Sequence, residues 1–326
     1  MGSVAVVGVL AGCGAPGAAN SGESSPEETE LLMAAYSTPR EAYEGIMADY
    51  GRSEAGREVS FDRSFGASGE VSRAVEAGLP ADVAGFSLEP DMERLVESGT
   101  VAEGWDEDRY GGMVTDSVVV IAVREGNPKG IRGWEDLTRP GVDVITPSPS
   151  TSGGAKWNFM AAYGAQIERG SSEEEALGYV GDLLGNVSVQ DKSARDSLQT
   201  FINGRGDAMI AYENEIVQAR QLGYDFEYVV PGETILIETP YAVTETSEHP
   251  QKAQDFLDYL RSEEAQRTFG EKGYRPVVPE VREEFDYEEP SGLFTIEDYG
   301  GWETVDEEFF GPEGRITQVV EEEGLQ

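Results

Sequence analysis

The sequence predicts an α/β protein with two lobes, each a mostly parallel sheet flanked by helices. From Leu31 onward, short apolar runs typical of strands alternate with stretches of helical periodicity, and this alternation is typical of parallel sheets with crossover helices. The folded part has roughly 300 residues, which exceeds what one hydrophobic core comfortably holds, so two lobes fit the length better than one.

The expected elements alternate along the chain. We expect strands at residues 31–35, 59–61, 81–86, 114–124, 142–145, 207–211, 226–231 and 234–243. We expect helices at residues 40–50, 68–78, 155–164 and 253–266, and one more that opens within 191–196. The helix at 68–78 places Val71, Ala74 and Val75 on one apolar face. We expect the first lobe to contain residues 29–115 and 238–326, and the second to contain residues 116–237.

The chain is strongly acidic, with 24 Lys and Arg against 63 Asp and Glu among 326 residues and a net charge of −39. Such a surface repels phosphate backbones and anionic lipids, which argues against nucleic acid as a partner. The carboxylates are dispersed and lysines are few. This pattern is typical of proteins from salt-loving archaea, where salt screens the repulsion between like charges. An ordinary acidic protein is the alternative.

The chain has one cysteine and one histidine, His249. These counts exclude an intrachain disulfide and a cysteine-based zinc site, and they argue against histidine-dependent catalysis. We therefore expect a protein that is not an enzyme and needs no metal or cofactor.

The first residues resemble a secretion signal with a lipid attachment site. A short apolar stretch, too short to span a bilayer, ends in Leu10-Ala11-Gly12-Cys13, which resembles the lipobox of secreted lipoproteins. The segment 14–28 is rich in Gly, Ala, Ser, Pro and Glu and reads as a flexible tether. We expect residues 1–28 to lie outside the fold, with Cys13 lipidated. A basic segment before the apolar stretch is absent, and a buried free cysteine is the alternative.

Three segments place small or polar residues between a strand and the start of a helix. They are Phe65 to Glu70, Ile145 to Ala155, and Asp191 to Asp196. Helix starts present unpaired N–H groups and the positive end of the helix dipole, and open α/β sheets bind ligands at the carboxyl ends of their strands. Each start alone could be an ordinary cap. Together they indicate a site for an oxyanion held by neutral donors.

Further motifs along the chain include Tyr36-Ser37-Thr38-Pro39-Arg40-Glu41-Ala42-Tyr43, Thr151-Ser152-Gly153-Gly154-Ala155-Lys156-Trp157-Asn158 and Ala211-Tyr212-Glu213-Asn214-Glu215. With these motifs and the three segments above, the chain between Leu31 and Val305 resembles the sulfate/thiosulfate-binding proteins of ABC transporters. That family belongs to the type II periplasmic binding protein superfamily. The resemblance implies a two-lobed fold and an extracytoplasmic place. It also implies an ABC permease as partner and a monomeric protein that delivers sulfate or thiosulfate to it.

The resemblance also implies which residues bind the anion. The first lobe would contribute Ser37, Ser68 and Gly69, and the second would contribute Ser152, Gly153, Gly154, Ala194 and Tyr212. Tyr212 stands where the family usually has Trp, and Ser37 stands where it has Asp, so these two contacts differ from the family pattern. The alternatives are a core aromatic for Tyr212 and a helix cap for Ser37. We expect Arg40 and Arg195, close to these segments, to pair with carboxylates.

Other functions remain open from the sequence. The anion could be molybdate, tungstate or phosphate. A hydrolase of phosphate or sulfate esters would need a nucleophile with a base or metal, and a purely structural surface protein would not need the Ser-Gly-Gly helix start. We expect a membrane contact only through the lipid anchor.

Overall fold

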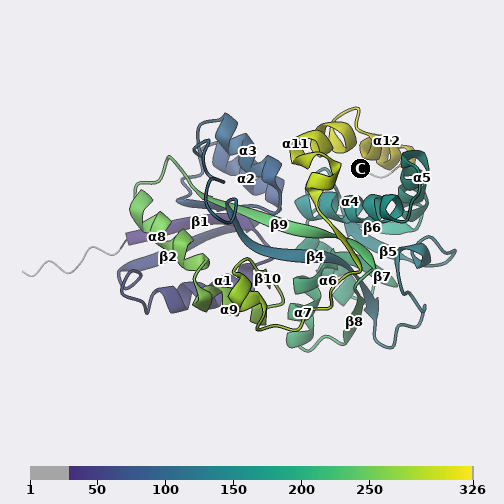
Figure 1. Ribbon diagram of the computed structural model, residues 1–326, viewed down its shortest axis with the longest axis horizontal. Coiled ribbons are helices and arrows are strands. Elements are labelled where there is room, and N and C mark those ends of the chain that lie inside the picture. Colours follow the sequence, from purple (N-terminus) through teal and green to yellow (C-terminus); the bar gives the residue numbers. More distant parts are fainter. Residues whose placement is uncertain (1–28, 325–326) are drawn as a thin grey trace, which may run out of the picture.

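A computed structural model describes residues 29–324, and these residues form a curled sheet with helices on its outside (Figure 1). The main path of the sheet has the order β2-β1-β3-β9-β4-β7-β5-β6, with β8 and β10 paired to β4 and β11 paired to β9. The strands are β1 (Thr29–Tyr36), β2 (Val59–Gly66), β3 (Val83–Gly85), β4 (Met113–Arg124), β5 (Val144–Pro147), β6 (Val187–Asp191), β7 (Ala208–Tyr212), β8 (Phe226–Val229), β9 (Glu233–Val243), β10 (Arg275–Pro276) and β11 (Gly292–Phe294).

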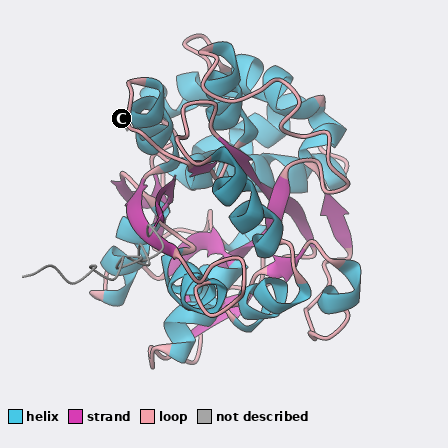
Figure 2. Cartoon of the chain, turned by 90° about the vertical axis from the view of Figure 1, so that its left-hand side faces the viewer, coloured by secondary structure: helices cyan, strands magenta, loops and turns pink. Residues whose placement is uncertain are grey.

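The helices enclose the strands, as the view turned by 90° shows (Figure 2). Near β1 and β2, helices α2 and α3 cover one face and α1, α8 and α9 the other; near β5, α4 and α5 lie opposite α6 and α7 (Figure 1). The helices are α1 (Arg40–Tyr50), α2 (Ser68–Glu76), α3 (Glu89–Glu97), α4 (Gly153–Glu168), α5 (Glu173–Leu184), α6 (Ala194–Ile202), α7 (Glu213–Gln221), α8 (Pro250–Leu260), α9 (Glu263–Glu271), α10 (Pro279–Arg282), α11 (Gly301–Val305) and α12 (Arg315–Glu322), with short helical turns η1 (Trp134–Asp136), η2 (Ile296–Tyr299) and η3 (Asp306–Phe310).

Strand direction separates two lobes. Strands β1, β2 and β3 pair in parallel, and so do β5, β6 and β7. We call the first group with its helices the first lobe and the second group the second lobe. The antiparallel pairs all involve β4 or β9 in the described chain, so each sheet is less uniformly parallel than we expected. The long strands β4 and β9 pair with each other and run from one lobe into the other.

The two positions at which we expected the chain to change lobes are neighbours in the β4–β9 ladder. Thr115 pairs with Thr239 and Asp116 with Glu238, and the hydroxyls of the two threonines lie 2.8 Å apart. Both are buried. We propose that the chain passes between the lobes at these positions.

The C-terminal segment packs differently from the expected lobe division. Strand β11 pairs with residues Glu233, Thr234 and Ile235 of β9. Trp302 of α11 meets Trp157 of α4 edge to face, with ring centroids 4.6 Å apart, and Phe309 packs against Tyr163 of α4 in the same way. Buried aromatic area therefore holds residues 292–322 against α4 and α5 of the second lobe, although we expected residues 238–326 to belong wholly to the first lobe.

The predicted helix at 253–266 is two helices. Helix α8 ends at Leu260 and α9 begins at Glu263. Ser262 caps α9, because its hydroxyl accepts the N–H of Ala265. A serine followed by two glutamates is a helix start signal that the continuous apolar periodicity concealed.

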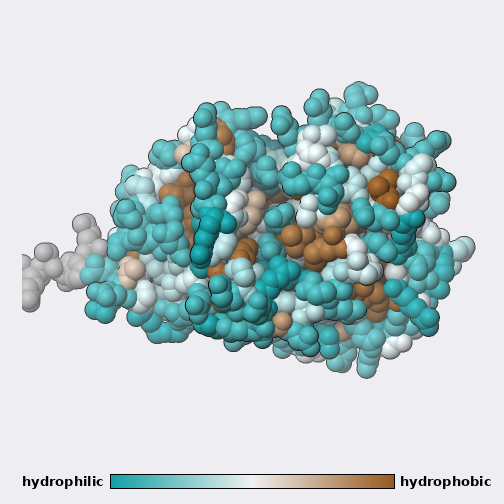
Figure 3. All heavy atoms as spheres, viewed as in Figure 1, coloured by the Kyte–Doolittle hydropathy of each residue, from teal (hydrophilic) through white to brown (hydrophobic). Residues whose placement is uncertain are grey.

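In the described part of the chain, no helix combines the length and the apolar character needed to cross a membrane. On the face drawn in Figure 3, hydrophilic side chains cover most of the surface and apolar ones gather in small patches. The apolar bulk lies instead in a core that runs through both lobes.

Candidate binding site

The predicted site residues come together at one cavity between the lobes. Thirteen residues line it, and none has a charged side chain: Tyr36, Ser37, Thr38, Gly66, Ala67, Ser68, Ser87, Ser152, Gly153, Gly154, Ser193, Ala194 and Tyr212. Seven of the eight predicted residues are among them. Gly69 is not among them; a Cβ atom at this position would lie 3.2 Å from Arg73 Nη1 and 3.6 Å from the carbonyl oxygen of Thr151.

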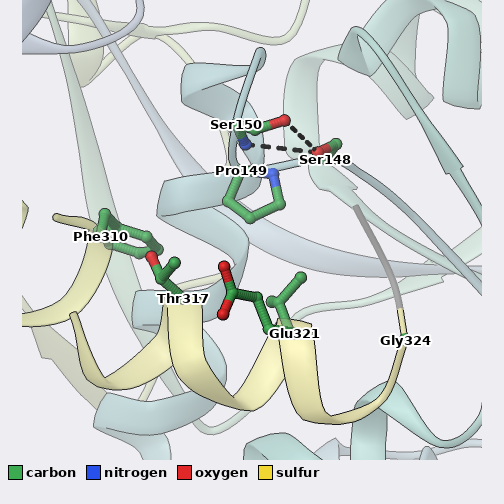
Figure 4. A pocket seen from close by; sticks show the side chains of 8 residues that line it. Ser148, Pro149, Ser150, Phe310, Thr317, Glu321 and Gly324 are labelled. Atoms are coloured by element: carbon green, nitrogen blue, oxygen red, sulfur yellow. Dashed lines mark hydrogen bonds between the residues drawn. The ribbon is translucent and has the colours of Figure 1, made fainter. Parts of the chain in front are cut away.

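The cavity is small. The room inside it is about 10 Å³, whereas pockets for drug-sized ligands measure roughly 300–1,000 Å³. A larger hollow of about 620 Å³ lies between α12 and the loop Ser148-Pro149-Ser150, on the outer side of the segment that leads into α4 (Figure 4). Its lining includes Phe310, Thr317 and Glu321, and it brings none of the predicted residues together.

Helix α4 presents its first turn to the cavity without a side-chain cap. Ser152 is the N-cap residue with extended backbone (φ −111°), yet within the described chain its hydroxyl makes no cap hydrogen bond. Its own N–H donates to the carbonyl of Ser148 at 2.9 Å. The hydroxyl of Ser152 and the first N–H groups of α4 are thus available to a ligand. An uncapped helix start of this kind attracts an anion.

Gly153 lies against the first lobe. A Cβ atom at this position would come within 2.1 Å of Ser87 Oγ and 2.7 Å of Leu88 Cγ. The glycine therefore permits the two lobes to meet at the cavity, which explains why the first turn of α4 contains a residue that weakens helices.

Ser68, at the start of α2, has its hydroxyl engaged. The hydroxyl donates to Asp91 Oδ2 at 2.6 Å and accepts the N–H of Ser87 at 3.0 Å. Arg94 donates to the other oxygen of Asp91 at 2.9 Å. Gly66, Ala67 and Ser68 at the start of α2 line the cavity, while the Ser68 side chain holds the neighbouring loop in place through the N–H of Ser87.

Helix α6 contributes its start through Ala194. The preceding Ser193 is a cap, as its pattern predicted: its hydroxyl accepts the N–H of Asp196 at 3.1 Å and donates to the carboxylate of Asp196 at 2.7 Å. Arg195 turns away from the cavity and pairs with Glu41 of the first lobe, which confirms that it pairs with a carboxylate. Arg40 instead lies over the ring of Phe65, with its guanidinium carbon 5.5 Å from the ring centroid. Among the described residues no carboxylate lies within ion-pair distance of Arg40, so that part of the expectation is wrong.

Tyr212 reaches the cavity from the end of β7. Burial raises the pKa of its phenol well above the usual value, the nearby Tyr36 raises it further, and the Ser87 hydroxyl lowers it. The N–H of Tyr212 donates to Glu215 Oε2 at 3.2 Å. Burial also raises the pKa of Glu215 to about 7, against the effects of this N–H and of Arg195. On the opposite wall, the buried Ser37 donates its N–H to the carbonyl of Gly66 at 2.9 Å.

Several lining residues were not predicted from the sequence, and Ser87 is the most important of them. Ser87 directly follows the strand expected at 81–86, so it satisfies the same criterion that singled out the other three segments. Its carbonyl accepts the indole N–H of Trp157 at 2.6 Å. This buried hydrogen bond joins the first lobe to α4, and with the Glu41–Arg195 pair it holds the lobes together around the cavity.

The donors that line the cavity have the chemistry of an oxyanion site. The starts of α2, α4 and α6 converge on it, and hydroxyl groups fill the spaces between them. Helix N-termini and neutral N–H and O–H donors bind negative charge, and a small cavity without cations selects by hydrogen bonds and size. In residues 29–324, no group of three or more His, Cys, Asp or Glu residues could hold a metal ion.

Residues 31–275 match the family of bacterial extracellular solute-binding proteins. The chain belongs to this family. A sulfate-binding protein of Synechococcus elongatus is 38% identical over 97% of this chain and 93% of its own length. A sulfate-binding protein of Escherichia coli is 36% identical over 90% of this chain and 93% of its own length.

Solved structures show the same fold. The sulfate-binding protein SubI from Mycobacterium tuberculosis superposes with a TM-score of 0.83 at 40% identity, covering 85% of this chain and 98% of that one. The periplasmic binding protein AfuA from Actinobacillus pleuropneumoniae, at 19% identity, has a TM-score of 0.67 and shares the fold. The predicted α/β periplasmic-binding-protein fold is confirmed. The family is one of binding proteins, in agreement with the expectation that the chain is not an enzyme.

Proposed function

We propose that this protein captures sulfate or thiosulfate outside the cytoplasm and delivers it to an ABC permease. The observation that carries the proposal is the small cavity without charged residues, on which three helix starts and several hydroxyls converge. A dianion can accept hydrogen bonds from all of these donors without gaining or losing a proton. The names of the similar sulfate-binding proteins support the same ligand.

We assign Ser152, Gly153, Gly154, Ala194 and Tyr212 as the donors of the second lobe, and Ser37 with the backbone of the α2 start at Ser68 as those of the first. Gly69, which does not line the cavity, is left out. Calorimetric titration of the purified protein with sulfate, thiosulfate, molybdate, tungstate and phosphate tests the proposal. We expect sulfate or thiosulfate to bind most tightly. Heat of binding from none of the five anions would refute it.

We further propose that the protein is a monomer anchored to the cell surface through Cys13, which lies outside the described residues. Replacing Cys13 with Ser should release the protein from the membrane into the medium and leave its anion affinity unchanged. Equal membrane retention of the two forms would refute the anchor. Light scattering that shows a dimer would refute the monomer.

A further inference from the structure

Ser87 is held by its backbone from both sides. Its N–H donates to Ser68 Oγ at 3.0 Å, and its carbonyl accepts the indole N–H of Trp157 at 2.6 Å. Ser68 is in turn fixed by its hydrogen bond to Asp91 at 2.6 Å. The main chain at Ser87 is therefore rigidly placed where the two lobes meet.

The hydroxyl is the one polar group of Ser87 that forms no hydrogen bond in the described chain. It is buried and has no hydrogen-bond partner among residues 29–324. It lines the cavity and lies so close to α4 that a Cβ atom on Gly153 would be 2.1 Å from it. A buried hydroxyl without a partner costs about 1–3 kcal/mol, and at the cavity wall an anion that accepts a hydrogen bond from it would remove this cost.

Tyr212, in the second lobe, carries a second buried hydroxyl. Within the described chain its OH makes no hydrogen bond of ordinary length, although the Ser87 hydroxyl is close enough to lower the pKa of the phenol. A Cβ atom on Gly154 would lie 3.7 Å from its ring carbon Cε1. The two hydroxyls thus flank the first turn of α4, Ser87 beside Gly153 and Tyr212 beside Gly154.

We infer that Ser87 binds the anion directly, its hydroxyl donating together with that of Tyr212 across the lobe interface. The inference rests on the proposed function and adds a residue to it. Ser68, whose hydroxyl is already donated to Asp91, becomes a positioning residue that fixes Ser87.

This assignment couples ligand binding to lobe closure. Ser87 belongs to the first lobe and Tyr212 to the second, so both hydroxyls reach one anion only when the lobes are together. An anion that accepts hydrogen bonds from both hydroxyls stabilises the closed form relative to the open one, because only the closed form allows both bonds.

Sulfate titration of Ser87→Ala and Tyr212→Phe, followed by the double variant, tests the inference. Each single change removes a donor facing a charged acceptor and should weaken sulfate binding about 10- to 100-fold. Because the two donors share one anion, the double variant should lose less than the product of the two single losses. Without sulfate, Ser87→Ala should melt no lower than the wild type, because it deletes an unpaired hydroxyl. If Ser87 had only a structural role, Ser87→Ala would instead melt at a lower temperature than the wild type.

Ser197→Ala is the matched control. The hydroxyl of Ser197, in α6, is also buried and without a partner in the part of the chain that the structure describes, but it does not line the cavity. Its variant should bind sulfate like the wild type. Wild-type affinity in Ser87→Ala, or an equal loss in Ser197→Ala, would overturn the inference while leaving the proposed function intact. A wild-type protein that binds no sulfate would instead overturn the proposed function, and the inference with it.

Discussion

Glu41 in α1 and Arg195 in α6 form an ion pair that joins the first lobe to the second, with Arg195 Nη1 donating to Glu41 Oε2 at 3.0 Å and Nη2 to the other carboxylate oxygen. Both side chains are partly exposed. The pair lies beside the anion cavity and involves no cavity-lining residue. It is therefore a contact that contributes to closure without touching the ligand.

Replacing Glu41 with Gln should weaken anion binding modestly, about 1.4- to 5-fold, because a partly exposed ion pair contributes roughly 0.2–1 kcal/mol. The difference from the wild type should shrink in molar salt, where the charges are screened. Titration at two salt concentrations checks both statements. Glu44→Gln, an exposed change on the same helix, is the control and should bind like the wild type.

The same pair gives an expected pH dependence. Burial alone would raise the pKa of Glu41, but the hydrogen bonds and charge of Arg195 lower it below the usual value. A carboxylate with a lowered pKa contributes above its ordinary pKa, and the contribution is lost as pH falls through the lowered value. The affinity advantage of the wild type over Glu41→Gln should therefore persist at neutral pH and disappear in acid.

Ser152→Ala should cost about 10- to 150-fold in anion affinity, which corresponds to roughly 1.5–3 kcal/mol for one donor to a charged acceptor. The N-cap hydroxyl makes no cap hydrogen bond in the described structure, so helix stability should barely change. Ser150→Ala is the control, since its hydroxyl bonds to Ser148 at the outer hollow. If calorimetry gave Ser152→Ala the wild-type affinity, the hydroxyl would not bind the anion.

Gly153→Ala should weaken binding more than Ser152→Ala, because the added Cβ would overlap Ser87 Oγ and Leu88 Cγ and keep the lobes apart. Gly178→Ala in α5 adds the same methyl group where nothing lies within 4 Å, and it should leave affinity unchanged while stabilising the helix slightly. Small-angle scattering with saturating sulfate should show a more open Gly153→Ala protein. A closed, tightly binding Gly153→Ala variant would contradict this account of the glycine.

The sequence predicted most of the residues that share one cavity because its signals are local. Helix α1 has the predicted bounds of residues 40–50. Within each lobe the predicted segments follow the carboxyl ends of parallel strands, and the cavity lies where the two lobes meet. The features that the sequence did not predict depend on contacts between residues that are far apart in the chain. Asp91 accepts the Ser68 hydroxyl from 23 residues away, and Trp302 packs against Trp157 from a distant part of the chain. Neither contact has a local sequence pattern. The unpaired hydroxyl of Ser87 and the position of the C-terminal segment therefore could not be predicted.

The dispersed carboxylates lead to a prediction about salt. We propose that they adapt the protein to high salt, and the folded state should then lose stability as KCl falls well below about 1 M, where screening weakens. Thermal melting from roughly 0.1 to 3 M KCl checks this. A melting temperature that stays flat over that range would contradict the adaptation.

Asp116 and Glu238 stand directly opposite each other on the two strands that cross between the lobes. Burial first, and then the charge of Glu238, raise the pKa of Asp116 to about 7, against the opposing effects of Arg282 and Arg275. In the unfolded chain an aspartate titrates near 4. Between about pH 4 and pH 7 the folded protein therefore holds a proton that the unfolded chain has lost. Stability from this group is complete below the lower value and is lost as pH rises through the upper one.

Asp116→Asn should remove this loss. Across pH 4 to 8 the wild type should give up on the order of 4 kcal/mol of unfolding free energy through this carboxyl, while the variant stays nearly flat by comparison. Denaturant unfolding at fixed KCl measures both profiles. Asp225→Asn, an exposed change beyond α7, should follow the wild-type profile. Parallel profiles for Asp116→Asn and the wild type would mean that Asp116 is already ionised at pH 5 in the folded protein. In that case the guanidinium of Arg282, 3.5 Å from Asp116, would lower the pKa of Asp116 more than burial and the carboxylate of Glu238 raise it.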